Sequence, residues 1–168
     1  MIVALWMIGG ALPKILHSRK ITRITAELAV AFPALPTEEA WLVLLREAET
    51  FKMGIERDRI RLVSYRVELA ELEREGLPAH VVRKPTIRDL GAGRGESAVI
   101  LSRHFSEIGP IWHAYALQFQ AIVRSSIYDL ATIDALCDQF NHLSHRAIDE
   151  IEDAIPLIRD GVRRVVAI

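Results

Sequence analysis

Apolar residues recur at intervals of three and four from Trp41 to Leu72, for about five heptads, within a helix predicted over 37–75. Such spacing places one apolar stripe along a long helix, and that stripe must be buried against other helices. Asp58 is the only charged residue in the stripe. The predicted buried positions are Trp41, Leu44, Ala48, Phe51, Ile55, Asp58, Leu62, Tyr65, Leu69 and Leu72.

The ends of this helix are also marked in the sequence. Thr37 supplies a capping hydroxyl before two acidic residues, and Gly76 followed by Leu77-Pro78 supplies a C-terminal stop. At 1.5 Å per residue the helix would be roughly 58 Å long, whereas a compact chain of this size should be only about 40 Å across. We therefore expect an elongated bundle, or a helix that projects to meet another chain. A break, if present, is expected at the charged run after Gly54.

A second apolar seam predicts another long helix over about 111–155, and Pro156 is expected to kink it or to begin a short C-terminal helix. The positions of this seam are Ala116, Phe119, Val123, Ser126, Leu130, Ile133, Cys137, Phe140, Ser144, Ala147, Ile151, Ala154, Ile158, Gly161 and Val165. An N-terminal helix is predicted over 2–32, with a bend or break near Gly9, Gly10 and Pro13. Ser97 is expected to cap a short helix that reaches about Phe105.

These elements predict an all-α fold in one domain, 1–168: an elongated antiparallel helical bundle of coiled-coil type. Residues 77–96 form its Gly/Pro-rich connector. Hydrophobic residues make up 51% of the chain and charged residues 26%, which is apolar for an elongated helical protein. We therefore expect additional burial in a homodimer or higher oligomer. The formal net charge of −1 excludes a generally basic chain of the nucleic-acid-binding type.

The sharpest local motif is the glycine-rich segment 89–95, Asp-Leu-Gly-Ala-Gly-Arg-Gly. It resembles the first motif of Rossmann-type methyltransferases that use S-adenosylmethionine. That resemblance implies a buried strand before the glycines and alternating strands and helices after them. The preceding residues 83–88 instead carry three charges and a proline, and no strand pattern follows. The sequence therefore favours a glycine-rich connector, and we expect no cofactor.

The same connector could hold an anion. Loop amides at the start of a helix, beside arginines, are suited to a phosphate group. An anion- or nucleotide-binding regulatory or enzymatic protein that uses residues 88–97 is therefore one alternative function. The residues of this predicted anion site are Arg88, Gly91, Gly93, Arg94, Gly95 and Ser97.

Other candidate chemistry is weak. Asp138, His142, His145 and Asp149 share one side of the second predicted helix, but that side lies opposite the apolar seam, so we predict no metal site. The single cysteine, Cys137, excludes an internal disulfide and is predicted to be a small buried residue. No histidine is placed to activate a nucleophile, so we predict no catalytic residue.

The remaining feature is the N-terminus, where residues 1–13 carry no charge and Lys14, Arg19, Lys20 and Arg23 follow. A secretory signal would have its positive charge before the apolar run, and this run is too short to span a bilayer. A second alternative is therefore a peripheral membrane protein anchored by residues 1–16. The leading prediction is a non-enzymatic, cytoplasmic interaction, scaffold or adaptor protein. Its expected partners are itself and another protein, and not a nucleic acid.

Overall fold

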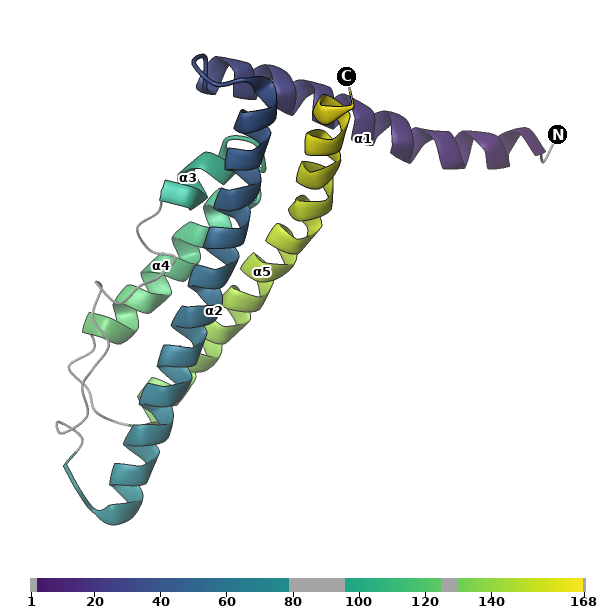
Figure 1. The fold of residues 1–168 in the computed structure, drawn as a ribbon. Helices are drawn as coiled ribbons and strands as arrows, with labels where there is room; N and C mark the ends of the chain where they lie inside the picture. Colours follow the sequence, from purple (N-terminus) through teal and green to yellow (C-terminus); the bar gives the residue numbers. More distant parts are fainter. Residues whose placement is uncertain (1–2, 79–95, 125–129, 168) are drawn as a thin grey trace. The chain divides into compact units, whose positions relative to one another are not determined.

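The computed structural model describes residues 3–78, 96–124 and 130–167, with residues 3–13 described by their backbone alone, and these residues form helices and no strand (Figure 1). The all-α fold class is therefore confirmed. The helices are α1 (Val3–Ala31), α2 (Thr37–Glu75), α3 (Glu96–Ser102), α4 (Ile108–Arg124) and α5 (Leu130–Val166). Within the described ranges, none of the helices is both long and apolar enough to cross a bilayer.

Helix α2 begins and ends where the sequence predicts. Its last turn is closed by a hydrogen bond from the Leu77 N–H to the Leu72 carbonyl, at 2.9 Å, and Gly76 adopts a φ of 67° there. This backbone conformation suits glycine, which has no Cβ to collide with the preceding turn. The helix continues without a break past Gly54. Nine of the ten predicted stripe positions are buried, and Leu72 is half-buried.

The second long helix predicted over 111–155 is corrected to two helices, α4 and α5, and residues 125–129 between them lie outside the described residues. The ring centroids of Tyr115 and Phe140 are 4.7 Å apart, whereas one straight helix would separate these residues by about 38 Å. The chain therefore folds back on itself. Helix α4 also begins earlier than predicted, because Pro110 in its first turn has no N–H that would need an intrahelical acceptor.

Two expected helix breaks are also corrected. Helix α5 continues through Pro156 to Val166, so there is no separate C-terminal helix in the described chain. The Pro156 ring lies on the exposed side of α5, where water can take the place of the lost hydrogen bond. Helix α1 likewise continues through Gly9, Gly10 and Pro13. In α3, Glu96 occupies the first helical position, so Ser97 lies inside the helix and does not cap it.

The chain divides into two compact units, each with its own core. The terminal unit comprises residues 1–46 and 153–168, and the central unit comprises residues 47–152. In the terminal unit, the fully buried Trp41 packs on Gly161 and donates an indole hydrogen bond to Thr25 Oγ1 at 3.2 Å. The core of the central unit contains Phe51, Ile55, Leu62, Tyr115, Phe119, Ile133 and Phe140.

Candidate interaction site

The outward side of α2 in the central unit carries a second apolar row, which we call the α2 stripe. Its members are 50–67% exposed, although large apolar side chains normally avoid water in such a row. They recur at intervals of seven, three and four, so they lie on one face of the helix, away from the buried stripe. The α2 stripe consists of Met53, Ile60, Val63 and Val67.

Three basic residues spaced seven apart lie along one flank of the α2 stripe and bind α5. Lys52 Nζ lies 2.5 Å from Glu152 Oε1, and this hydrogen bond raises the pKa of Lys52. Further along α2, Arg66 Nη1 lies 3.2 Å from Asp138 Oδ1. Rising numbers on α2 thus meet falling numbers on α5, so the two helices run antiparallel within the central unit.

The middle basic residue, Arg59, bonds two side chains of α5. Its Nε donates to Asn141 Oδ1 at 3.1 Å, and its Nη2 lies 3.1 Å from His145 Nε2. His145 Nδ1 lies 2.8 Å from the Asn141 carbonyl oxygen. The two contacts agree if the neutral imidazole donates from Nδ1 and accepts at Nε2. Both ring nitrogens are then occupied, and neither is free to bind a metal.

A groove of about 190 Å³ lies beside Val63, between α2 and α5. It is open to solvent and smaller than the roughly 300–1,000 Å³ of typical small-molecule pockets. It is large enough for a side chain from another protein. Its lining includes Arg59, Leu62, Val63, Arg66, Cys137 and Phe140.

Cys137 lines this groove but is a poor nucleophile. Burial raises the pKa of its thiol to about 11. At pH 8 its thiolate fraction is therefore about 100-fold below that of a thiol with the unperturbed pKa. We expect alkylation by iodoacetamide to be slower by at least that factor in the native chain than in the urea-unfolded chain, as measured by mass spectrometry. Equal rates would show that the thiol is neither buried nor protonated.

The buried carboxylate of Asp58 contributes to the packing of the helices and not to an active site. It is fully buried, and Tyr115 donates its phenolic hydrogen to Asp58 Oδ2 at 2.5 Å. Burial raises the pKa of Tyr115, and the charge of Asp58 raises it further. Arg61 Nη1 lies 4.0 Å from the other carboxylate oxygen. Because both members are enclosed by the core, the pair stabilises the contact between α2 and α4 and offers no approach for a substrate.

Most of the predicted anion site, Arg88, Gly91, Gly93, Arg94 and Gly95, lies outside the described residues. Ser97 is described, and its hydroxyl donates to Glu47 Oε2 at 2.5 Å. The one described residue of this site is therefore next to a carboxylate, which repels anions.

The histidine and aspartate side chains of α5 do not form a metal site. Asp138 binds Arg66, and both ring nitrogens of His145 have partners. Within residues 14–78, 96–124 and 130–167, no three His, Cys, Asp or Glu side chains are grouped to hold a metal ion.

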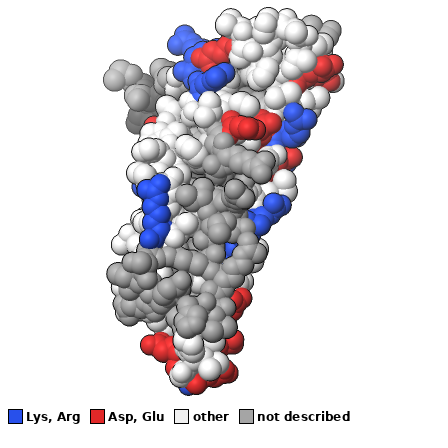
Figure 2. Space-filling view, turned by 90° about the vertical axis from the view of Figure 1, so that its left-hand side faces the viewer, with Lys and Arg blue, Asp and Glu red and all other residues white. Residues whose placement is uncertain are grey.

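Charged residues of both signs are interspersed on the described part of the face shown in Figure 2. Acidic side chains gather at its lower end. The described residues of this face therefore form no continuous basic surface of the kind that binds a nucleic-acid backbone.

Sequence reasoning missed the α2 stripe because its four members are interrupted by charged residues, whereas the buried stripe is nearly continuous. The repeated spacing of Met53, Ile60 and Val67, seven residues apart, is the signal that could have found it.

No protein-family model, curated protein or solved structure matches this chain.

Proposed function

We propose that this chain is a non-enzymatic helical interaction protein that associates with a second copy of itself through the α2 stripe. The observation that carries the proposal is a row of large apolar side chains, half to two-thirds exposed, on a helix whose opposite face is fully buried. Removing such a row from water is the main favourable contribution to association between helices.

The spacing of the α2 stripe suits a two-fold symmetric contact. Met53 precedes Ile60 by seven residues and Val67 follows it by seven. If two α2 helices pack antiparallel about an axis at Ile60, each Met53 meets the partner's Val67, and the two copies of Ile60 meet each other. A two-fold interface requires a surface that is complementary to itself in this way.

Shape also supports this pairing. The groove beside Val63 would accept part of the partner's side chain. Because the contact extends over only about 21 Å of helix, we expect a dimer whose population depends on concentration.

The first test is the mass of the intact chain in solution, measured by light scattering coupled to size-exclusion chromatography. We expect a dimer that Ile60→Glu weakens by about two orders of magnitude, because it places two carboxylates against each other in an apolar contact. Leu117→Glu changes an apolar residue of α4 that is 53% exposed, against 67% for Ile60, and serves as the matched control. A chain that is monomeric at high concentration, or a dimer that survives Ile60→Glu, would contradict the proposal.

The single cysteine allows a second test of the register. In a Cys137→Ala background, Ile60→Cys should form an intermolecular disulfide rapidly on mild oxidation, because the two-fold axis places both residues 60 side by side. Val99→Cys, on the exposed side of α3, should remain largely reduced. Equal cross-linking of the two variants would exclude the proposed axis.

A further inference from the structure

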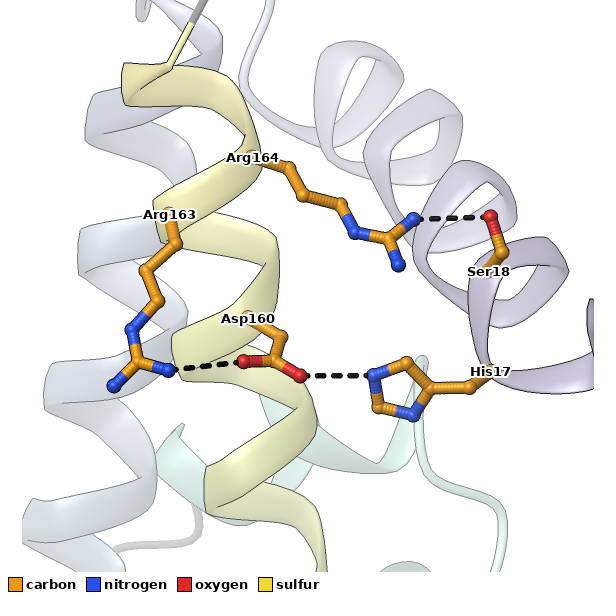
Figure 3. A network of polar contacts seen from close by, with 5 residues as sticks. All are labelled: His17, Ser18, Asp160, Arg163 and Arg164. Atoms are coloured by element: carbon orange, nitrogen blue, oxygen red, sulfur yellow. Dashed lines mark hydrogen bonds and ion pairs between the residues drawn. The ribbon is translucent and has the colours of Figure 1, made fainter. Parts of the chain in front are cut away.

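The C-terminal turns of α5 are held beside α1 in the terminal unit by two polar contacts (Figure 3). His17 Nε2 lies 3.1 Å from Asp160 Oδ2, and Arg164 Nη1 donates to Ser18 Oγ at 2.9 Å. These contacts join segments that are more than 140 residues apart in the sequence. Basic residues that are far apart in the sequence are thereby brought into one unit.

The two helices together carry an excess of positive charge, which we call the basic end. Helix α1 contributes the exposed Lys14, Arg19, Lys20 and Arg23. Helix α5 contributes the exposed Arg159, Arg163 and Arg164. Residues 14–27 and 159–166 contain only two acidic residues against these seven cations. Both are paired: Asp160 with His17 and with Arg163, whose Nη1 lies 3.3 Å from Asp160 Oδ1, and Glu27 with Arg23, whose Nε lies 3.4 Å from Glu27 Oε1.

The basic end adjoins exposed apolar surface. Ile15 and Leu16 are 48% and 59% exposed and lie between Lys14 and Arg19 on α1. The thirteen residues before Lys14, MIVALWMIGGALP, contain no charge, and α1 extends back through them to Val3. At the other helix, Val166 is 58% exposed after the arginines.

We infer that the terminal unit binds the surface of an anionic lipid bilayer. The N-terminal part of α1 lies in the headgroup region, and the basic end binds the lipid phosphates. An uncharged helical segment followed by clustered lysine and arginine is the combination that anionic bilayers retain, because apolar insertion and charge attraction act together. A nucleic acid would use the cations but not the exposed apolar residues, so the lipid surface accounts for more of what is observed. This inference does not depend on dimerisation through the α2 stripe.

The test is co-sedimentation of the full chain with phosphatidylcholine vesicles, with or without about a third of phosphatidylserine. We expect binding only to the anionic vesicles, weakened by added salt. The triple variant Arg159→Gln/Arg163→Gln/Arg164→Gln should lower the affinity for anionic vesicles by about 100-fold. This expectation assumes a loss of about five-fold for each cation removed. The matched control removes three exposed arginines of the central unit, Arg103→Gln/Arg124→Gln/Arg146→Gln, and should bind as the unchanged chain does.

The apolar contribution is tested separately by Ile15→Glu/Leu16→Glu, which should reduce vesicle binding at least as strongly as the arginine variant. Circular dichroism of every variant shows whether it remains helical. Absence of binding to anionic vesicles at low salt would overturn the inference, as would equal losses in the arginine variant and its control. Retention of a fluorescent single-stranded RNA that depends on the same arginines, without vesicle binding, would assign the basic end to nucleic acid and overturn it too.

Discussion

The substitution Leu62→Asp is expected to unfold the central unit, whereas Ile60→Asp is expected to leave it folded. The two residues lie on the same helix, but Leu62 is 2% exposed and Ile60 is 67% exposed. A carboxylate at position 62 would lose its hydration and would also remove the packing of a leucine. Together these should cost more than about 5 kcal/mol, which is comparable to the whole stability of a small domain.

The measurement is the helical signal in circular dichroism through a urea titration. Ile133→Asp, which is fully buried on α5, should behave as Leu62→Asp does. At a protein concentration where the chain is monomeric, the Ile60→Asp variant should change the free energy of unfolding by less than about 0.5 kcal/mol, as exposed substitutions usually do. If both α2 variants unfold at the same urea concentration, the assignment of the buried and outward faces of α2 is wrong.

Adding one methyl group at Gly161 is expected to destabilise the terminal unit. A Cβ at this position would lie 2.5 Å from two atoms of the Trp41 ring and 2.6 Å from a third. The ring is fully buried and tied to Thr25, so it cannot move aside freely. Alanine favours a helix over glycine by about 1 kcal/mol, but overpacking of this kind typically costs about 1–3 kcal/mol or more. We therefore expect Gly161→Ala to lower the free energy of unfolding despite its better helix propensity.

A double-mutant cycle identifies the cause. Trp41→Phe shortens the ring that faces position 161, so Gly161→Ala should be less damaging in that background, with a coupling of about 1 kcal/mol or more. Gly109→Ala is the control for helix propensity with a milder contact, because its Cβ would lie 3.2 Å from Ser102 Cβ and 3.9 Å from Ser102 Oγ. If Gly161→Ala stabilises the native chain, the close approach of Trp41 to α5 is not as described.

The part of the fold that local pattern predicts well is α2. Its buried stripe is nearly continuous, and Thr37 and Gly76 lie at its ends, so the apolar spacing and the residues at the two ends indicate the same 39 residues. Asp58 also follows from the pattern as the exceptional member. The pattern could not show that the Tyr115 hydroxyl donates a hydrogen bond to the Asp58 carboxylate, because the two residues are 57 positions apart in the sequence.

Periodicity could not separate α4 from α5. Both helices face the same core, so their apolar positions continue in one apparent register across residues 125–129. The two serines and the aspartate of the sequence Ser-Ser-Ile-Tyr-Asp are the only local sign of an interruption. The prolines led to the opposite error, because helix breaks were predicted where the helices continue. Pro13 and Pro156 lie within helices because the surrounding helix tolerates one lost hydrogen bond.

The candidate sites were the least predictable part. The α2 stripe consists of residues that are unremarkable singly, and only their exposure distinguishes them from core positions. The basic end depends on the contact of α5 with α1, which no local rule predicts. The anion site predicted in the connector remains a prediction.

The enclosed carboxylate of Asp58 also restricts how the helices of the central unit can align. A heptad pattern alone tolerates sliding by seven residues, or about 10 Å, since apolar positions would again meet apolar positions. Such a slide would carry Asp58 away from the Tyr115 hydroxyl and strand a desolvated negative charge. It would also take Lys52 from Glu152 to the level of His145. The apolar residues alone would allow several alignments of α2 with its neighbouring helices. Asp58 and Lys52 have their partners in only one of these alignments, so that alignment is the stable one.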